Sequence, residues 1–175
     1  MKLIYRTAYM NKLASAMGTP DIKVITGIRR CGKSKLLEAF ADQIRASFPT
    51  ANIIRINFNL LEFEPLMQYR ALHDYVEKHF VEGCNNVVII DEVQMCEGFE
   101  KAINSLHASE KYDIYITGSN AFLLSNDLST LFTGRTFEVE VFPFSLAEFV
   151  QYHEITSPDE ALTRYLREGG MPGSY

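Results

Sequence analysis

Eight consecutive residues in the first part of the chain combine two glycines, a lysine and a serine at fixed spacing. The segment Gly27 to Ser34 reads Gly-Ile-Arg-Arg-Cys-Gly-Lys-Ser. Its glycines permit backbone angles that aim several N–H groups inward, and a helix that follows the loop adds the positive end of its dipole. Because a β-rich run precedes the segment and an apolar helical pattern follows it, we expect this loop to bind the phosphates of a nucleotide.

Residues within this loop differ in their expected roles. Lys33 can reach the β- and γ-phosphates and is also a candidate catalytic residue, while the Ser34 hydroxyl can bind a magnesium ion that bridges those phosphates. A coincidental glycine turn with a solvated lysine is the alternative, and the strand–loop–helix setting disfavours it. Two arginines in such a loop are unusual, and outward positions there more often pair with acids than contact phosphate. The predicted nucleotide-binding residues are Gly27, Ile28, Arg29, Arg30, Cys31, Gly32, Lys33, Ser34 and Lys35.

A second group of chemically capable residues follows an apolar run. Residues 87–90 are valine and isoleucine only, and Asp91 and Glu92 come directly after them. Asp91 would hold the magnesium ion through a water molecule, and Glu92 would orient and partly deprotonate the attacking water. The alternative is that both acids simply begin a loop. The phosphate-binding segment upstream favours the magnesium site.

Two further candidates lie later in the chain. The tail of the next strand should sense the γ-phosphate, through Asn120 or Ser119, although both side chains could instead cap the helix that follows. Arg135 could stabilise transition-state charge as an arginine finger, in its own subunit or in a neighbouring one. Its alternative is a surface guanidinium paired with Glu138. The predicted catalytic residues are therefore Glu92, Lys33, Asn120 and Arg135.

Apolar spacing along the chain predicts alternating strands and helices, which indicates an α/β fold with a parallel sheet. The run at 87–90 does not alternate, as expected for a central strand covered on both faces. In contrast, residues 137–141 alternate apolar and acidic side chains, which favours a strand near a sheet edge. The predicted strands are 22–26, 52–58, 87–90, 112–117 and 137–141, and the predicted helices include 6–17, 97–108, 145–152 and 158–167.

Length, charge and cysteine content limit the possible classes of protein. A chain of 175 residues with a net charge of -5 fits one domain and does not indicate direct nucleic-acid binding. Its three cysteines show no metal-ligand spacing, so reduced thiols are expected. No apolar run approaches the roughly 20 residues needed to cross a bilayer, and we expect no membrane association and a cytoplasmic location.

Five segments together resemble one family, the AAA-superfamily P-loop ATPase domain of prokaryotic proteins whose C-terminal half is a domain of unknown function. They are Gly27 to Ser34, Ile89 to Gln94, Ile116 to Asn120, Leu131 to Arg135 and Gly169 to Pro172. The resemblance implies ATP and magnesium as ligands and a three-layer sandwich with strand order 5-1-4-3-2. It also implies that residues 1–175 form the ATPase domain, with residues 1–20 as a helical lead-in, and that a C-terminal domain follows.

Two functions remain open from the sequence. The first is an ATP hydrolase that couples turnover to a missing C-terminal domain or a partner, and a homo-oligomer is one option for the assembly. The second is a nucleotide-gated switch in which hydrolysis is slow and ATP exposes a binding surface. A small-molecule phosphotransferase is less favoured because no arginine-rich lid is visible beyond Arg135. A GTPase is less favoured because no Asn-Lys-x-Asp element is present.

Overall fold

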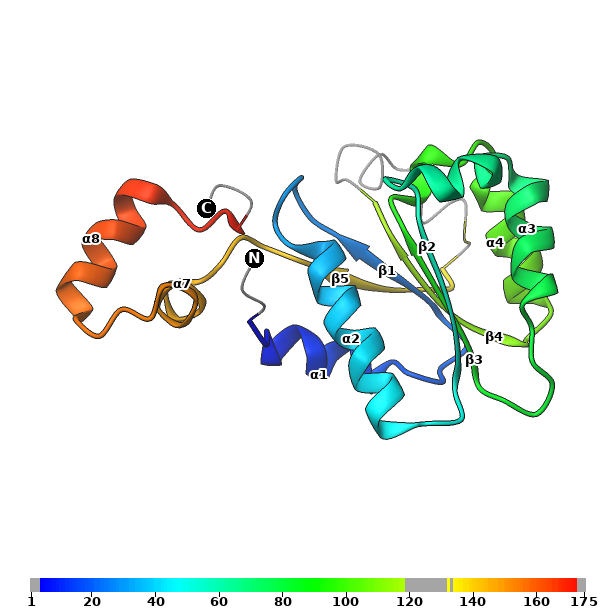
Figure 1. Ribbon diagram of the computed structural model, residues 1–175, viewed down its shortest axis with the longest axis horizontal. Helices are drawn as coiled ribbons and strands as arrows, with labels where there is room; N and C mark the ends of the chain where they lie inside the picture. The colour runs from blue at the N-terminus through cyan, green and yellow to red at the C-terminus, as the bar shows by residue number, and fades with distance from the viewer. Residues whose placement is uncertain (1–3, 119–131, 133, 173–175) are drawn as a thin grey trace.

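In the computed structural model, five parallel strands form one sheet with helices on both faces (Figure 1). The structure describes residues 4–118, 132 and 134–172. The strands are β1 (Ile22–Thr26), β2 (Asn52–Asn57), β3 (Asn86–Asp91), β4 (Tyr112–Thr117) and β5 (Thr136–Glu140). The helices are α1 (Thr7–Ser15), α2 (Lys33–Ser47), α3 (Tyr69–Lys78), α4 (Phe99–Ala108), α7 (Leu146–His153) and α8 (Pro158–Glu168), with short 3-10 helices η1 (Leu61–Leu66) and η2 (Val93–Met95).

The strand order is β2-β3-β4-β1-β5, which is the predicted order 5-1-4-3-2 read from the other edge. Strand β4 therefore lies between β1 and β3. Every residue of β3 is buried, as its unbroken apolar run predicts for an inner strand. Strand β5 lies at the edge and keeps two exposed glutamates, Glu138 and Glu140, on either side of buried Val139. The α/β class and the order of the sheet are thus confirmed.

The two faces of the sheet bury separate apolar clusters. Helices α1 and α2 cover one face, where Leu37 and Phe40 pack with Ile89 and Tyr115. Helices α3 and α4 cover the other face, where their apolar residues pack against inner side chains of β2, β3 and β4. Successive residues of a strand point to opposite faces, so fully apolar strands can serve both clusters. None of the described helices is long and apolar enough to span a bilayer.

Parallel pairing brings the chemically capable segments to one edge of the sheet. The loop 27–32 leaves the carboxyl end of β1, Asp91 ends β3, and Thr117 ends β4. In parallel sheets the carboxyl ends of neighbouring strands lie together, and this is the edge at which α/β folds place their ligands. The register pairs Ile25 with Thr117 and aligns Ile90 with Ile116. Three separate stretches of sequence thus meet there.

Helices α7 and α8 form a pair beside the three-layer body, next to the N-terminal segment (Figure 1). Phe149 is fully buried between them, and Ile4 and Phe144 complete a small apolar cluster. Helix α7 begins with a capping box, in which Ser145 and Glu148 satisfy each other's backbone N–H groups. The segments before α7 and after α8 are joined by a hydrogen bond, in which the Phe144 N–H donates to the Gly170 carbonyl at 2.6 Å.

The predicted element bounds are close to the observed ones, with one informative shift. The helix expected from Glu97 begins at Phe99, because Gly98 adopts a positive φ of 69° immediately before it. Residues 169–172 fold back toward the phosphate-binding loop. A Cβ on Gly32 would lie 3.8 Å from Pro172 Cγ. The return of this segment places Pro172 beside the loop.

Candidate nucleotide-binding site

The loop between β1 and α2 has a backbone that only glycine fits at its first position. Gly27 adopts a φ of 146°, and a Cβ there would clash with the carbonyl oxygen of Val141 and come within 2.8 Å of Cys31 Sγ. Cys31 itself is fully buried. Burial raises the pKa of its thiol despite the nearby Lys33, so the thiol stays protonated at neutral pH and serves packing. The close approach of the β5 exit therefore fixes the shape of this loop.

The N-terminus of α2 is free to bind an anion. Its N-cap residue is Gly32, with a φ of 100°, and no side chain caps the helix. The first turn contains no acidic residue. The first N–H groups of a helix have no partner within it and carry the positive end of the dipole. A helix of 15 residues that starts in this way offers a ready site for phosphate.

Lys33 lies inside the loop. Only 4% of its surface is exposed, and its Nζ donates to the carbonyl oxygens of Gly27 at 2.8 Å and Ile28 at 3.2 Å. These contacts hold the ammonium group across the mouth of the loop, next to the uncapped helix. An ammonium with three donors can exchange a carbonyl for a phosphate oxygen without leaving this position. The residues present thus fit a bound triphosphate.

Asp91 and Glu92 are linked to the neighbouring strand by one hydroxyl group. Thr117 Oγ1 donates to Asp91 Oδ1 at 2.5 Å and accepts the N–H of Glu92 at 3.0 Å. Asp91 is buried, with 6% of its surface exposed, whereas Glu92 is half-buried and has a positive φ of 57°. The two adjacent acids therefore differ in burial and in backbone conformation. The sequence analysis did not select Thr117, which binds both acids.

The two predicted magnesium ligands share the wall of one cavity. A cavity of about 430 Å³ is lined by both Ser34 and Asp91, together with Asn57 and Lys35. No cluster of three or more His, Cys, Asp or Glu residues able to hold a metal exists among the described residues. A small set of oxygen donors suits magnesium, which keeps several waters and takes its other ligands from phosphates. The donor set at this edge fits that ion.

The remaining loop residues are exposed. Ile28, Arg29 and Arg30 all face solvent, and Arg30 has a positive φ of 68°. The Lys35 side chain pairs with Glu38 at 2.6 Å, and this hydrogen bond holds the pKa of the Glu38 carboxyl below its ordinary value. The side chain of Lys35 is thus engaged on the surface of α2. Any contact of these residues with a nucleotide through their backbone or side chains stays a prediction.

The structure does not bring Arg135 to the loop. The Ile22 N–H donates to the Arg135 carbonyl at 2.9 Å, and β5 pairs with β1 from Thr136 opposite Ile22. Arg135 is exposed and therefore sits at the amino end of β1, whereas the phosphate-binding loop begins at its carboxyl end. The five residues of β1 separate these ends by about 13 Å. This placement disfavours action of Arg135 in its own subunit, and its action on a neighbouring subunit and its alternative as a surface residue both stay predictions. Ser119 and Asn120 lie outside the described residues.

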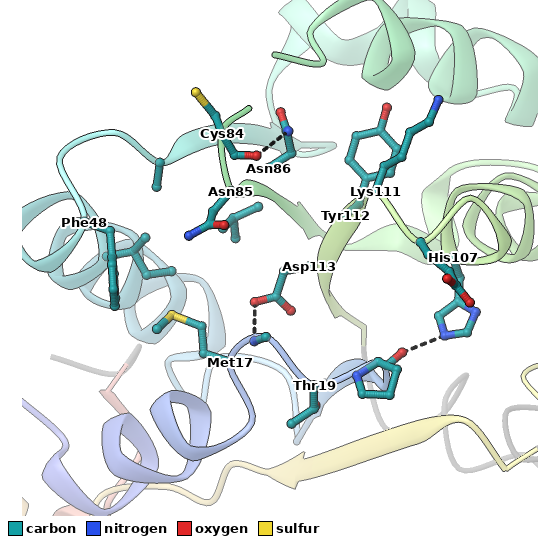
Figure 2. A pocket seen from close by; sticks show the side chains of 16 residues that line it. Met17, Thr19, Phe48, Cys84, Asn85, Asn86, His107, Lys111, Tyr112 and Asp113 are labelled. Carbon is teal, nitrogen blue, oxygen red and sulfur yellow. Dashed lines mark hydrogen bonds between the residues drawn. The ribbon is translucent and has the colours of Figure 1, made fainter. Parts of the chain in front are cut away.

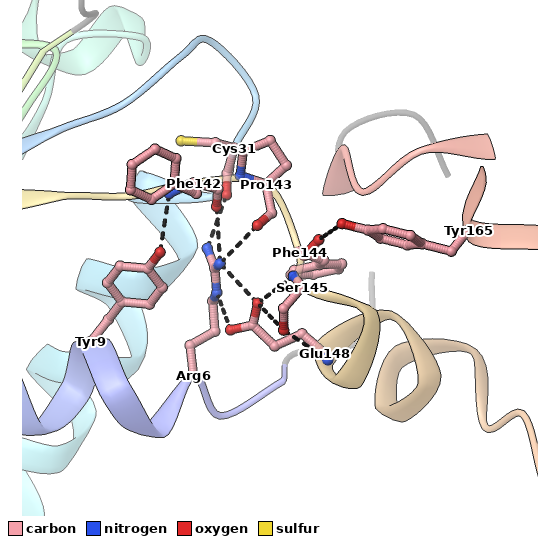
Figure 3. Close-up of polar contacts among 9 residues, drawn as sticks. All are labelled: Arg6, Tyr9, Cys31, Phe142, Pro143, Phe144, Ser145, Glu148 and Tyr165. Carbon is pink, nitrogen blue, oxygen red and sulfur yellow. Dashed lines mark hydrogen bonds and ion pairs between the residues drawn. The ribbon is translucent and has the colours of Figure 1, made fainter. Parts of the chain in front are cut away.

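Arg6 connects the loop to α7 and was not selected from the sequence (Figure 3). Its guanidinium is 5% exposed and binds the Glu148 carboxylate through two nitrogens, at 2.8 Å and 3.0 Å. It also donates to the Cys31 carbonyl at 3.2 Å and to the Phe142 carbonyl at 2.9 Å. The sequence gives little signal for this arginine, because its partners lie up to 142 residues away.

Another cavity, of about 550 Å³, lies at the amino ends of the strands, far from the phosphate-binding loop (Figure 2). Two of its titratable side chains are engaged in hydrogen bonds within the protein. Asp113 accepts hydrogen bonds from the Gly18 N–H at 3.0 Å and from Lys23 Nζ at 2.6 Å, and His107 binds the Pro20 carbonyl at 2.7 Å. These pairs stabilise the fold around the cavity. We therefore place the chemistry at the other edge of the sheet.

Comparison with known families and sequences agrees with this geometry. The family model described as AAA domain matches residues 19–150. An uncharacterised protein of Haemophilus influenzae is 34% identical over 97% of this chain, which covers 44% of that relative. An uncharacterised protein of Methanocaldococcus jannaschii is 30% identical over 86% of this chain, which covers 35% of it. The chain thus spans less than half the length of these relatives.

Solved structures share the fold at low sequence identity. The ORC1 protein of Aeropyrum pernix, solved with DNA, has a TM-score of 0.67 and 12% identity, and the match covers 99% of this chain and 58% of that one. AMPPCP-bound DnaA of Aquifex aeolicus has a TM-score of 0.61 and 18% identity, over 97% and 57% of the two chains. The PCH-2 structure of C. elegans has a TM-score of 0.62 and 17% identity, over 95% and 50%.

Proposed function

The chain belongs to the AAA-domain family of P-loop ATPases, and on that premise we propose that it binds ATP with magnesium and hydrolyses the bond to the γ-phosphate. One observation carries the proposal. The uncapped N-terminus of α2, the Lys33 ammonium and the two oxygen donors Ser34 and Asp91 all meet at one edge of the sheet. The structural likeness to a DnaA bound to the ATP analogue AMPPCP supports the same choice of ligand.

Binding and orientation follow from groups already in place. The α2 N–H groups and Lys33 would hold the β- and γ-phosphates, and Ser34 and Asp91 would hold magnesium, which supplies positive charge to those phosphates. Thr117 fixes the Asp91 carboxylate through its short hydrogen bond. The Glu92 carboxylate would accept a proton from the attacking water. Adjacent acids with different partners can thus perform separate tasks.

The substitution Glu92→Gln tests the hydrolysis step. We expect the variant to bind magnesium and ATP with unchanged affinity, because Glu92 is not among the proposed ligands of either. Its kcat should fall at least about 100-fold, since removal of a general base typically costs that much. Calorimetry and a phosphate-release assay measure the two quantities. Hydrolysis at the unaltered rate in Glu92→Gln would remove the base assignment.

A substitution at Lys33 tests whether the phosphate-binding loop binds ATP. The substitution Lys33→Met should weaken ATP binding about 10- to 100-fold, because a hydrogen bond to a charged group contributes about 1.5 to 3 kcal/mol. Lys12→Met, at an exposed position on α1, is the control and should bind ATP normally. If the unaltered protein takes up no nucleoside triphosphate in the presence of magnesium, the proposed function is wrong. Competition between ATP and GTP for binding shows whether the site prefers adenine or guanine.

A nucleotide-gated switch is the second candidate, and the Arg6 contacts favour it. One guanidinium touches the phosphate-binding loop through Cys31 and helix α7 through Glu148. A change in the loop on nucleotide binding would therefore reach α7 directly. Hydrolysis far slower than nucleotide exchange, with hydrogen exchange of α7 and α8 altered by a non-hydrolysable analogue, would favour this function.

The output of either function is proposed to lie outside residues 1–175. The relatives are more than twice as long as this chain, which leaves room in them for a further domain. We propose that nucleotide turnover acts on a C-terminal domain or a partner, and that subunits associate so that one completes the site of the next. Activity that is the same with and without the remaining chain would argue against such coupling.

A further inference from the structure

We propose that Gln94 positions Glu92 and accepts a hydrogen bond from the water that Glu92 activates. The inference rests on the proposed hydrolysis of ATP and adds a residue to that same site. Gln94 lies two positions after Glu92, within η2. Among residues 4–118, 132 and 134–172, its side chain is the one group bonded to the carboxylate of the proposed base. Three observations support the proposal, concerning the backbone, the amide and the unpaired oxygen.

The backbone of Glu92 is held on both sides. Its N–H donates to Thr117 Oγ1 at 3.0 Å, and its carbonyl accepts the Met95 N–H at 3.0 Å. Glu92 has a positive φ of 57°, and the next residue, Val93, is fully buried. A non-glycine residue in this conformation persists only when its surroundings determine it, and such residues concentrate at functional sites. The freedom that remains to Glu92 lies in its side chain.

Gln94 removes that freedom. Its Nε2 donates to Glu92 Oε2 at 2.5 Å. An ionised carboxylate only accepts hydrogen bonds, so the amide must present its NH₂ group to Glu92 and its oxygen must point elsewhere. The orientation of the Gln94 amide therefore follows from chemistry. One oxygen of the Glu92 carboxylate is held, and the other is left to take a proton.

The oxygen of the Gln94 amide is the third observation. Gln94 Oε1 is buried and has no hydrogen-bond partner within the described part of the chain. A buried acceptor without a partner costs about 1 to 3 kcal/mol, so a polar ligand is expected there. A water molecule has two protons to donate. It can give one to Glu92 and the other to Gln94, and its lone pair is then directed away from both toward the γ-phosphate.

The chemical step balances with these groups. The water oxygen forms a bond to the γ-phosphorus while the bond from that phosphorus to the β,γ-bridging oxygen breaks. The electron pair of the broken bond stays on the bridging oxygen, which leaves as part of ADP. One water proton passes to the Glu92 carboxylate, and the second remains on the new phosphate while its contact to Gln94 fixes the direction of attack. Gln94 is thus a positioning residue that does not itself exchange a proton.

Two substitutions test the proposal in the full-length protein. Gln94→Met keeps the length of the side chain and removes both polar atoms, and Gln94→Glu keeps its shape and removes the donor. Both should lower kcat at least about tenfold while KM and ATP affinity change less than about twofold, because positioning acts on the reacting water and not on nucleotide binding. Gln68→Met is the matched control. Gln68 makes the same type of bond to Glu97, at 2.7 Å, on the exposed surface.

A double substitution separates positioning from general damage. In the Glu92→Gln background, Gln94→Met should cause a clearly smaller loss of turnover than in the unaltered protein, because the part of its effect that acts through Glu92 is already lost. An additional loss as large as in the unaltered background overturns the proposal. An unchanged kcat in both Gln94→Met and Gln94→Glu also overturns the proposal. Thermal melting checks that each variant is folded. If the unaltered protein binds ATP but never hydrolyses it, the proposed hydrolysis fails and this inference fails with it. If the unaltered protein hydrolyses ATP and the Gln94 variants keep the same kcat, only the inference about Gln94 is overturned and the proposed function stands.

Discussion

At the scale of single residues, Thr117 is the point where two strands share one site. Its hydroxyl donates to Asp91 and accepts from the Glu92 backbone, so one oxygen sets the geometry of both acids. The hydroxyl is fully buried with these partners. Removing it would leave the Glu92 N–H and an Asp91 oxygen without their partner, and buried polar groups without partners are costly.

We therefore expect Thr117→Val to lower both stability and turnover. The valine fills the same volume, so the loss reflects the hydroxyl, and about 1 to 3 kcal/mol of unfolding free energy should be lost. Turnover should fall because Asp91 and Glu92 are no longer fixed. Urea denaturation and phosphate release measure the two effects. Thr136→Val, at the opposite edge of the sheet, is the control, and equal effects of both variants would contradict a special role for Thr117.

Gly27 offers a second test at this scale. Alanine at Gly27 must adopt an unfavourable φ and also clashes with the Val141 carbonyl, whereas alanine at Gly83 meets the φ penalty alone, since no atom lies within 4 Å of its Cβ. Gly83→Ala should therefore cost about 1 kcal/mol. Gly27→Ala should cost clearly more and should abolish ATP binding, because the loop must move. Denaturation curves measure the stability of the two variants, and calorimetry measures their ATP binding. Two equally stable variants would show that the loop tolerates a Cβ at Gly27.

At the scale of elements, the sequence predicts those parts of the site that are formed by residues adjacent along the chain. The loop between β1 and α2 and the acids at the end of β3 are local patterns, each with a strand next to it, so both could be placed from spacing alone. Gln94 follows Glu92 closely, but only the structure shows that its amide turns back to the carboxylate. Thr117 and Arg6 have partners 25 to 142 residues away, and no local spacing encodes such contacts.

The Arg6–Glu148 pair gives a prediction about elements, because it joins the start of α1 to α7. Burial raises the pKa of Glu148, but hydrogen bonds from Arg6 and Ser145 outweigh it and hold the pKa below the ordinary 4.5. A carboxyl with a lowered pKa adds stability that is fully present above its unfolded pKa and is lost as the pH falls through its folded pKa. The contribution of this pair should therefore disappear in acid, below about pH 4.5.

We expect Glu148→Gln to be less stable than the unaltered protein at pH 7, by about 1 to 3 kcal/mol, and this difference should shrink as the pH falls below 4.5. Arg6→Met should cost about 3 kcal/mol at pH 7, because it removes the cation beside the half-buried Glu148 carboxylate and the donor to the Cys31 and Phe142 carbonyls. Arg45→Met removes the exposed Arg45–Asp42 pair and should change stability by less than about 0.5 kcal/mol. A difference for Glu148→Gln that is constant with pH would contradict the charged pair.

At the scale of the whole molecule, the parallel sheet separates two groups of predicted residues. The phosphate-binding loop, Asp91 and Thr117 lie at the carboxyl ends of the strands, and Arg135 lies at the amino end of β1. A residue directly before a parallel strand lies at the amino edge of the sheet, so the placement of Arg135 depends on the direction of β5, which its parallel pairing with β1 establishes. If Arg135 stabilises transition-state charge, it must therefore do so on a second copy of the chain, in an assembly that offers this edge to the neighbour's loop.

A mixing experiment tests this directly. Arg135→Ala should keep ATP binding and lose kcat at least about 100-fold, while Lys33→Met loses its own site but keeps Arg135. Mixing the two inactive variants should restore turnover, because Arg135 of one copy then completes the intact loop of the other. Specific activity of the unaltered protein should also rise with protein concentration. Arg45→Ala, at an exposed position on α2, is the control and should stay active alone. No recovery on mixing, together with turnover independent of concentration, would leave Arg135 as a surface residue.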